Sequence, residues 1–190
     1  METVKEHLSA QGAVLVPVSF PDMEHSRTVS LTVQLPEALS AHSPYLEERG
    51  ELYSKDFRAG LALGQCLLAE HYVKAKRFIE TYRTQTTALF EDVDVILTPA
   101  TPEIAQKLGN VKTKRDGVEE AIGNAITRFT TFFNMTGHPA LTMPCAMHSK
   151  GLPIGIQFVA AHFDETTLFH VAHAVERAGK FAIPLPKVCV

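Results

Sequence analysis

The chain has 190 residues, of which 45% are hydrophobic, so it is long and apolar enough to form one domain, or part of a larger one, and is not disordered. Its formal net charge of −3 comes from acidic and basic residues mixed along the sequence, which argues against direct binding of nucleic acid. Cys66, Cys145 and Cys189 form neither a disulfide framework nor a zinc motif, and no apolar run reaches the ~18 residues of a membrane span. We therefore expect a soluble, cytoplasmic protein without a membrane anchor.

The first fifty residues predict a helix, a strand and a second helical segment. Residues 1–10 favour a short helix that ends near Gly12. The apolar, β-branched run AVLVPVSF, residues 13–20, predicts a buried strand, in which Pro17 requires an edge position or a bulge. Residues 23–50 are predicted to be mostly helical, with Pro36 at the first position of a helix, although alternating apolar residues before Pro36 leave a strand open.

The middle of the chain has a clear helical period. Over residues 55–90 it predicts one long surface helix, or two in series that break near Gly64. The face of this segment that should be buried comprises Tyr72, Ala75, Ile79, Tyr82, Thr86 and Leu89. The run VDVILTPATP predicts a buried strand, and residues 116–134 resume a helical pattern after a polar loop.

The last part of the chain predicts a hairpin followed by a helix. ALTMPCAM and LPIGIQFVAA are two apolar runs joined by HSKG, with Gly151 near the turn, which is typical of an antiparallel hairpin. Asp164 is placed to cap a helix over residues 165–178 that Gly179 closes. Strands and helices together indicate an α/β fold.

The candidate catalytic residues do not form a convincing constellation. Cys145 could be a nucleophile with His138 or His148 as its base, but Cys145 and His148 are three apart and would point to opposite faces of a strand. We favour Cys145 as a small buried apolar residue. His170 and His173 lie one helical turn apart, as two metal ligands would, but without a third ligand they predict ordinary helix packing. We predict no metal and no cofactor.

Three sequence blocks carry a resemblance to a known family. DVILTPATP at 94–102, RFTTFFNMTGHPALTMPC at 128–145 and GLPIGIQFVAAHFDETTLFHVAHAVER at 151–177 resemble, in order and spacing, the C-terminal portion of amidase-signature hydrolases. This family includes amidases and the amidase-like component of glutamyl-tRNA amidotransferases. The resemblance extends more loosely to GAVLVPVSFPD, YSKDFRAGLALG and EHYVKAKRF, so that it covers nearly the whole chain.

The resemblance implies the C-terminal half of the amidase-signature fold, a partial mixed β-sheet flanked by helices. It predicts a single subdomain over residues 1–190, with a helical segment at about 23–90 and a hairpin plus helix at about 140–178. The family cleaves amides with two serines and a lysine, the serines lying in a glycine- and serine-rich segment. This sequence contains no two adjacent glycines and no two adjacent serines, and we expect that segment upstream of Met1.

The resemblance therefore assigns no catalytic residue to this chain and gives it a framework role. It places one wall of the substrate cleft here, at Thr98, Pro99, Thr127, Arg128, Phe132 and Asn134. The polar loop at 103–118 would line the pocket entrance.

Three functions compete at this point. The first is a part of an amidase that acts on a small amide only together with a catalytic half supplied separately. The second is a binding or regulatory module derived from an amidase, and the third is an independent cysteine hydrolase that uses Cys145.

Strands that are apolar at nearly every position need cover on both faces, and we expect the helices at 55–90 and 165–178 to cover one. The chain should therefore self-associate or bind a separate N-terminal amidase half. An in-frame glycine- and serine-rich segment upstream of Met1 would favour the first function.

Overall fold

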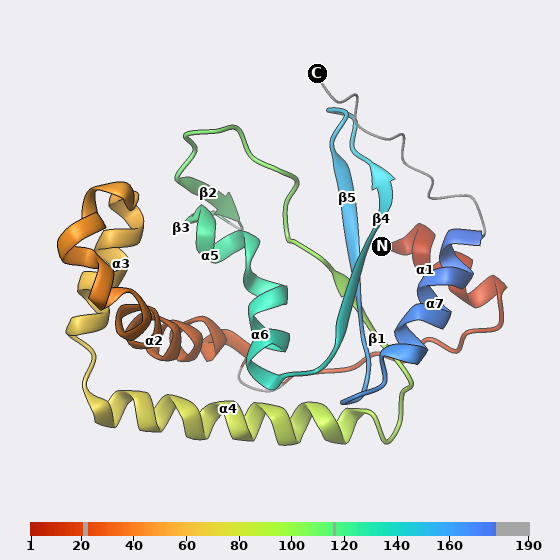
Figure 1. The fold of residues 1–190 in the computed structure, drawn as a ribbon. Coiled ribbons are helices and arrows are strands. Elements are labelled where there is room, and N and C mark those ends of the chain that lie inside the picture. The colour runs from red at the N-terminus through yellow and green to blue at the C-terminus, as the bar shows by residue number, and fades with distance from the viewer. Residues whose placement is uncertain (21–22, 116, 178–190) are drawn as a thin grey trace.

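The computed structural model describes residues 1–20, 23–115 and 117–177 (Figure 1). In chain order the elements are α1 (Glu2–Ala10), a 3₁₀ turn (Met23–His25), α2 (Ser26–Arg49), a 3₁₀ turn (Gly50–Leu52), α3 (Lys55–Gln65), α4 (Ala69–Leu89), β1 (Ile96–Pro99), β2 (Lys112–Arg115), β3 (Val118–Ala121), α5 (Ile122–Ile126), α6 (Arg128–Thr136), β4 (Ala140–Met147), β5 (Pro153–Val159) and α7 (Glu165–Arg177). The predicted end of the last helix at Gly179 and the residue Cys189 lie outside the described residues.

The main sheet has three strands in the order β1-β5-β4. The predicted hairpin is confirmed, because β4 and β5 pair antiparallel and Gly151 in their connection has a φ of 74°. β1 also pairs antiparallel with β5. The expected mixed sheet is thus antiparallel at each pairing within the described residues.

Apolar side chains cover both faces of this sheet, as the strand sequences predict. Along β1, Ile96 belongs to one buried cluster and its neighbour Leu97 packs against the other, which is the alternation of a strand. The first cluster, here called the α6-side core, comprises Val29, Val33, Ala75, Ile79, Tyr82, Ile96, Phe132, Phe133, Met135 and Val159. The second, the α7-side core, comprises Val4, Leu8, Cys145, Ile156, Phe158, Ala160, Leu168 and Val175.

The helices divide between the two faces. α4 contributes Ala75, Ile79 and Tyr82 to the α6-side core, whereas α7 contributes Leu168 and Val175 to the α7-side core. In Figure 1 the sheet accordingly stands between α6 and α7, with α4 running along the bottom. The expectation that segments 55–90 and 165–178 cover the same face is wrong, since each lies on its own side of the strands.

The helical segment confirms the two-in-series prediction and corrects one detail. α3 ends at Gln65 and α4 begins at Ala69, so the break falls just after Gly64. Pro36, predicted at the first position of a helix, lies inside α2 together with Pro44. The helix already begins at Ser26, ten residues before Pro36, because Val29 and Val33 on its first turns are buried. The packing of these side chains outweighs the destabilisation that a proline causes inside a helix.

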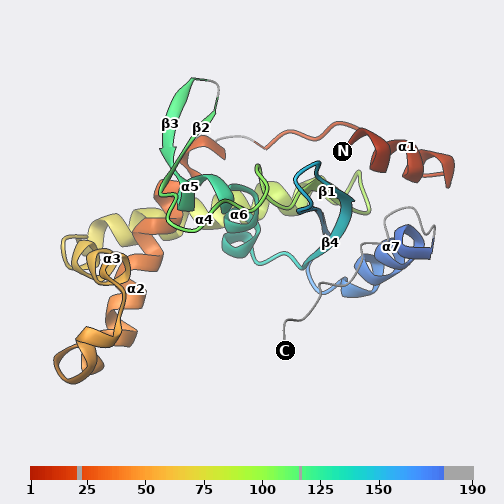
Figure 2. The same cartoon turned by 90° about the horizontal axis from the view of Figure 1, so that it is seen from above.

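Two further predictions are wrong. Residues 13–20 are not a strand, and their side chains up to Ser19 are exposed. Residues 117–121 are not helical either, because β2 and β3 pair as a short antiparallel hairpin before α5 begins. Cross-strand polar contacts stabilise this hairpin, such as the ion pair of Lys112 with Glu119, and Figure 2 shows it projecting from the body of the molecule.

No helix in the described part of the chain combines the length and the apolarity needed to cross a membrane.

Candidate functional site

The junction between α5 and α6 is held by an arginine from a distant helix. Arg27 on α2 donates from Nε to Asn124 Oδ1 at 2.9 Å and from Nη1 to Thr127 Oγ1 at 3.2 Å. Burial lowers the pKa of the Arg27 guanidinium, yet arginine stays charged at neutral pH. Thr127, one of the predicted cleft-wall residues, is therefore fixed by a charge-assisted contact, which is stronger than a neutral one.

Arg128, at the start of α6, is tied to the β2–β3 hairpin. Its Nη2 donates to Glu120 Oε2 on β3 at 2.7 Å, and the Glu120 side chain is only 19% exposed. The predicted wall residues Thr127 and Arg128 thus lie next to each other and are oriented by two different neighbours, α2 and β3. Each of the two side chains therefore has at least one fixed polar partner.

Thr98 lies in a polar row that crosses the sheet. Gln157 on β5 stands opposite Thr98 on β1 and Thr142 on β4, and its Nε2 donates to Thr98 Oγ1 at 3.1 Å. Since side chains two apart on a strand share a face, Thr98 lies on the same face as Ile96, toward α6. Pro99 is one residue further and turns to the opposite face.

The structure places two further predicted wall residues of α6, Phe132 and Asn134, in different surroundings. Phe132 is 1% exposed and packs in the α6-side core, with ring centroids 5.3 Å from those of Phe20 and Tyr82. Asn134 is exposed. Thr98, Thr127, Arg128 and Asn134 thus remain candidates for direct contact with a ligand, whereas Phe132 supports the helix from within.

Sequence reasoning missed the residues that orient this site. Gln157 had a usable signal, because a glutamine inside the apolar strand PIGIQFV is out of pattern for a strand covered on both faces. Arg27 and Asn124 had none, since the two residues are 97 positions apart in the sequence.

The cysteine and histidine candidates do not assemble. Cys145 is buried in the α7-side core, and burial raises the pKa of its thiol. The ring nitrogens of His138 contact Thr136 and Thr87, and His148 Nδ1 accepts from the backbone N–H of Lys150. Between the described residues no hydrogen bond or ion pair joins Cys145 to either histidine, so they do not have the geometry of a thiolate and its base.

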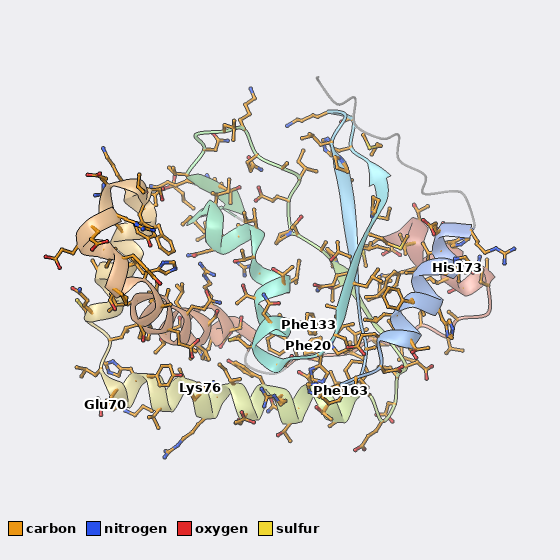
Figure 3. The ribbon with its side chains drawn as sticks, viewed as in Figure 1. Phe20, Glu70, Lys76, Phe133, Phe163 and His173 are labelled. Atoms are coloured by element: carbon orange, nitrogen blue, oxygen red, sulfur yellow. The ribbon has the colours of Figure 1, made fainter. Side chains whose placement is uncertain are left out.

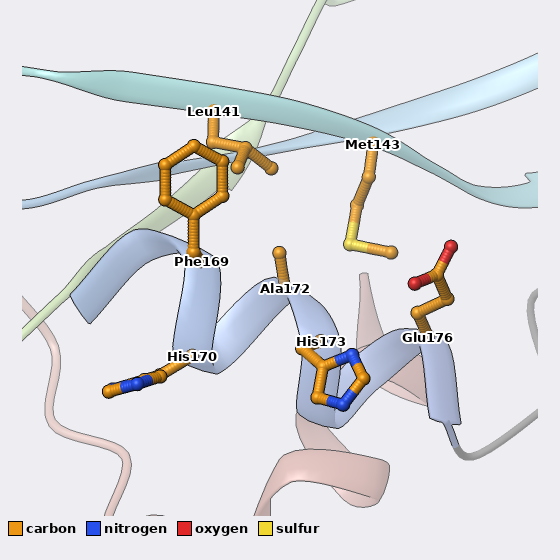
Figure 4. A pocket seen from close by; sticks show the side chains of 7 residues that line it. All are labelled: Leu141, Met143, Phe169, His170, Ala172, His173 and Glu176. Atoms are coloured by element: carbon orange, nitrogen blue, oxygen red, sulfur yellow. The ribbon is translucent and has the colours of Figure 1, made fainter. Parts of the chain in front are cut away.

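A groove of about 540 Å³ lies between β4 and α7, away from the cleft-wall residues. Its lining comprises Leu141, Met143, Phe169, His170, Ala172, His173 and Glu176. Figure 4 shows Phe169 and Ala172 pointing toward the strand, whereas His170 points away from it. Within residues 1–20, 23–115 and 117–177 no group of three or more His, Cys, Asp or Glu side chains is placed to hold a metal ion.

Comparison with known proteins decides the family. The sequence model described as "Amidase" matches residues 1–169. An amidase of Pseudomonas putida is 36% identical over 174 residues, which cover 91% of this chain. The chain belongs to the amidase family.

The match covers only part of each relative. The aligned segment is 37% of the Pseudomonas putida amidase. A fatty acid amide hydrolase of Medicago truncatula is 32% identical over 169 residues, and the aligned segment is 28% of that protein. A crystal structure of an amidase superposes with a TM-score of 0.86 at 26% identity, covering 93% of this chain and 40% of the other. The chain therefore spans well under half the length of the relatives it matches.

Proposed function

We propose that this chain is the C-terminal part of an amidase-type hydrolase, which supplies sheet framework and one wall of the substrate cleft. The residues that break the amide bond lie in a part of the amidase fold that this chain does not contain. One observation carries this proposal: 93% of the chain superposes on 40% of an amidase, while the sequence lacks the glycine- and serine-rich segment of the family's chemistry.

The geometry of the site supports a positioning role. Thr127 and Arg128 are braced by Arg27 and Glu120, and Thr98 is fixed by Gln157. Hydrogen-bonded side chains of this kind orient a small amide, whereas hydrolysis needs an activated nucleophile and donors for the oxyanion. Cys145, the one residue in the predicted blocks that could serve as a thiolate, is buried in the α7-side core.

The test compares the chain alone with the chain co-expressed with the part of the Pseudomonas putida amidase that lies outside the matched segment. We expect no hydrolysis of simple aliphatic or aryl amides by the chain alone and turnover by the pair. Losing nucleophile, base and oxyanion donors together removes most of an enzyme's rate enhancement, which is at least about 10⁶-fold. Turnover by the purified chain alone would overturn the proposal. A pair that binds amides without turnover would favour the alternative, a binding module derived from an amidase.

The wall itself is tested in the active pair. Asn134→Ala is expected to raise KM for the amide several-fold, because an exposed amide on the wall binds substrate without taking part in the chemistry. The control is Glu70→Gln, an exposed residue at the far end of α4 in Figure 3, which should leave KM unchanged. Equal KM values for the two variants would remove Asn134 from the wall.

A further inference from the structure

The side chain of Arg27 is a half-buried cation without an anionic partner. Arg27 is the second residue of α2, which packs against α6 in Figure 1, and it bonds to Asn124 and Thr127 at the α5–α6 junction. Both acceptors are neutral, and Arg27 takes part in none of the ion pairs between residues 1–20, 23–115 and 117–177. Burial lowers the pKa of the guanidinium, because it removes water that no nearby carboxylate replaces. An anion stabilises a partly desolvated cation of this kind.

The position of Arg27 in its helix makes this charge still less favourable. The first turn of α2 contains no acidic residue. A positive charge near the N-terminus of a helix is destabilising, because the helix dipole already places partial positive charge there. Arg128, the first residue of α6, is in the same situation, but it pairs with Glu120 at 2.7 Å. Of these two neighbouring arginines, only Arg27 therefore lacks a counter-charge among the described residues.

The hydrogen-bonding groups that remain around Arg27 are donors. Thr127 Oγ1 accepts from Arg27 and donates its own hydrogen to the carbonyl of Gly123 at 2.7 Å. Asn124 Oδ1 also accepts from Arg27, which leaves the amino group of that amide. Within the described residues no hydrogen bond uses Arg27 Nη2 or Asn124 Nδ2. A carboxylate, which only accepts hydrogen bonds, is complementary to such a set.

We propose that Arg27 binds a carboxylate of the substrate, so that the enzyme to which this chain contributes cleaves amides with a negative charge on their acyl side. The inference rests on the proposed function, which places Thr127, a partner of Arg27, in the cleft wall. Glu120 already neutralises Arg128, so the uncompensated charge matches a carboxylate better than a doubly charged phosphate. Asn124 and Thr127 hold the guanidinium in place, and a preorganised arginine loses little freedom on binding.

The experiment compares two amides in the active pair, the full chain co-expressed with the part of the Pseudomonas putida amidase outside the matched segment. Succinamate and butyramide differ only in that a carboxylate replaces the terminal methyl group. We expect kcat/KM to favour succinamate, and Arg27→Met to lower the ratio of the two kcat/KM values about ten- to hundredfold, as for a lost charged hydrogen bond. Arg27→Lys keeps the charge without the fork and should retain part of the preference. The control Arg77→Met removes an exposed arginine from α4 and should leave the ratio unchanged.

Asn124→Asp separates binding from bracing. The new side chain has nearly the same size and still accepts from Arg27, but its charge neutralises the guanidinium from within the chain. The unfolding temperature should therefore not fall. If Arg27 binds the substrate carboxylate, Asn124→Asp lowers the preference for succinamate as far as Arg27→Met does. An arginine that only braced the α5–α6 junction would keep the preference in this variant.

The outcomes distinguish this inference from the proposed function. Turnover of both amides with a ratio that neither Arg27→Met nor Asn124→Asp changes overturns the carboxylate site and leaves the proposed function standing. An equal fall of kcat/KM for both amides in Arg27→Met shows a brace alone and also overturns it. An unsubstituted pair that prefers butyramide has the same consequence. No turnover of either amide by the unsubstituted pair overturns the proposed function and this inference together.

Discussion

Beyond the C-terminal end of α6, the imidazole of His138 stacks on that of His162, with ring centroids 3.9 Å apart. His138 is 5% exposed, and its nitrogens lie 2.9 Å from Thr136 Oγ1 and 3.3 Å from Thr87 Oγ1. Burial, and then the electrostatic influence of His162 and Arg83, lower the pKa of His138 from 6.5 to about 4. The folded chain therefore keeps this ring neutral where an unfolded chain would protonate it.

We predict that the chain loses stability as the pH falls from 6.5 to 4. In that interval the unfolded state binds a proton that the folded state rejects, whereas above it both forms of His138 are neutral and below it both are charged. The loss should reach at most about 3.4 kcal/mol, at 1.36 kcal/mol per pKa unit. Urea unfolding at several pH values measures it. His138→Gln should flatten this part of the profile and His173→Gln, which alters an exposed ring, should not. An unchanged profile in His138→Gln would contradict the assignment.

The two described cysteines provide a second prediction at this scale. Cys66 is exposed, whereas Cys145 is buried and the pKa of its thiol is raised by that burial. Since the thiolate is the reactive form, alkylation of the native chain near neutral pH should modify Cys66 well before Cys145. Mass spectrometry of the digested protein resolves the two sites, with urea-unfolded chain as the reference in which both react. Preferential labelling of Cys145 would restore the cysteine nucleophile as a hypothesis. Cys189 lies outside the described residues.

At the scale of elements, α2 and α3 approach each other at a glycine. A Cβ atom on Gly64 would lie 2.6 Å from the carbonyl oxygen of Leu35, a backbone atom that cannot move aside without shifting α2. Gly64→Ala should therefore destabilise the chain, by about 1–3 kcal/mol as in other overpacked contacts. Gly60→Ala is the matched control on the same helix, since its Cβ would meet Leu35 Cδ2 at an ordinary 3.5 Å. It should stabilise the chain by about 0.5–1 kcal/mol. Thermal unfolding of both variants checks this, and equal effects would show that the helices do not meet so closely.

An element could be predicted where the local sequence shows both its type and the face that it buries. The helical period of α4 and the paired apolar runs of β4 and β5 contain both the element and the face that it buries, and both were predicted correctly. Residues 13–20 have the composition of a buried strand, but composition does not show what buries them, and the described chain leaves those up to Ser19 exposed. β2 and β3 were missed because short polar strands have no apolar alternation to reveal them.

In the candidate site, too, the local sequence does not reveal contacts between distant residues. Thr127 and Arg128 were proposed from a resemblance, and the structure adds the contacts that orient them. The partner of Thr127 is Arg27, 100 residues earlier, and no local spacing predicts such a pair. Gln157 was visible as a polar residue in an apolar strand, yet only the register of β1 against β5 shows that it faces Thr98.

For the whole molecule, several large apolar side chains are left exposed to water. Val14, Val16, Leu108, Phe163 and Phe169 are each more than half exposed. We predict that the isolated chain binds a dye specific for exposed apolar surface and associates with itself as its concentration rises. Adding the unmatched part of the Pseudomonas putida amidase should suppress dye binding and raise the unfolding temperature, because a partner that binds only the folded state stabilises it by mass action. Sedimentation and dye fluorescence measure both effects.

The double substitution Val14→Thr, Val16→Thr keeps β-branched side chains but makes them polar, so it should lower dye binding while the chain stays folded. A chain that remains monomeric at every concentration and binds no dye would show that its surface is complete without a partner, and would favour the stand-alone binding module over the missing part of an enzyme.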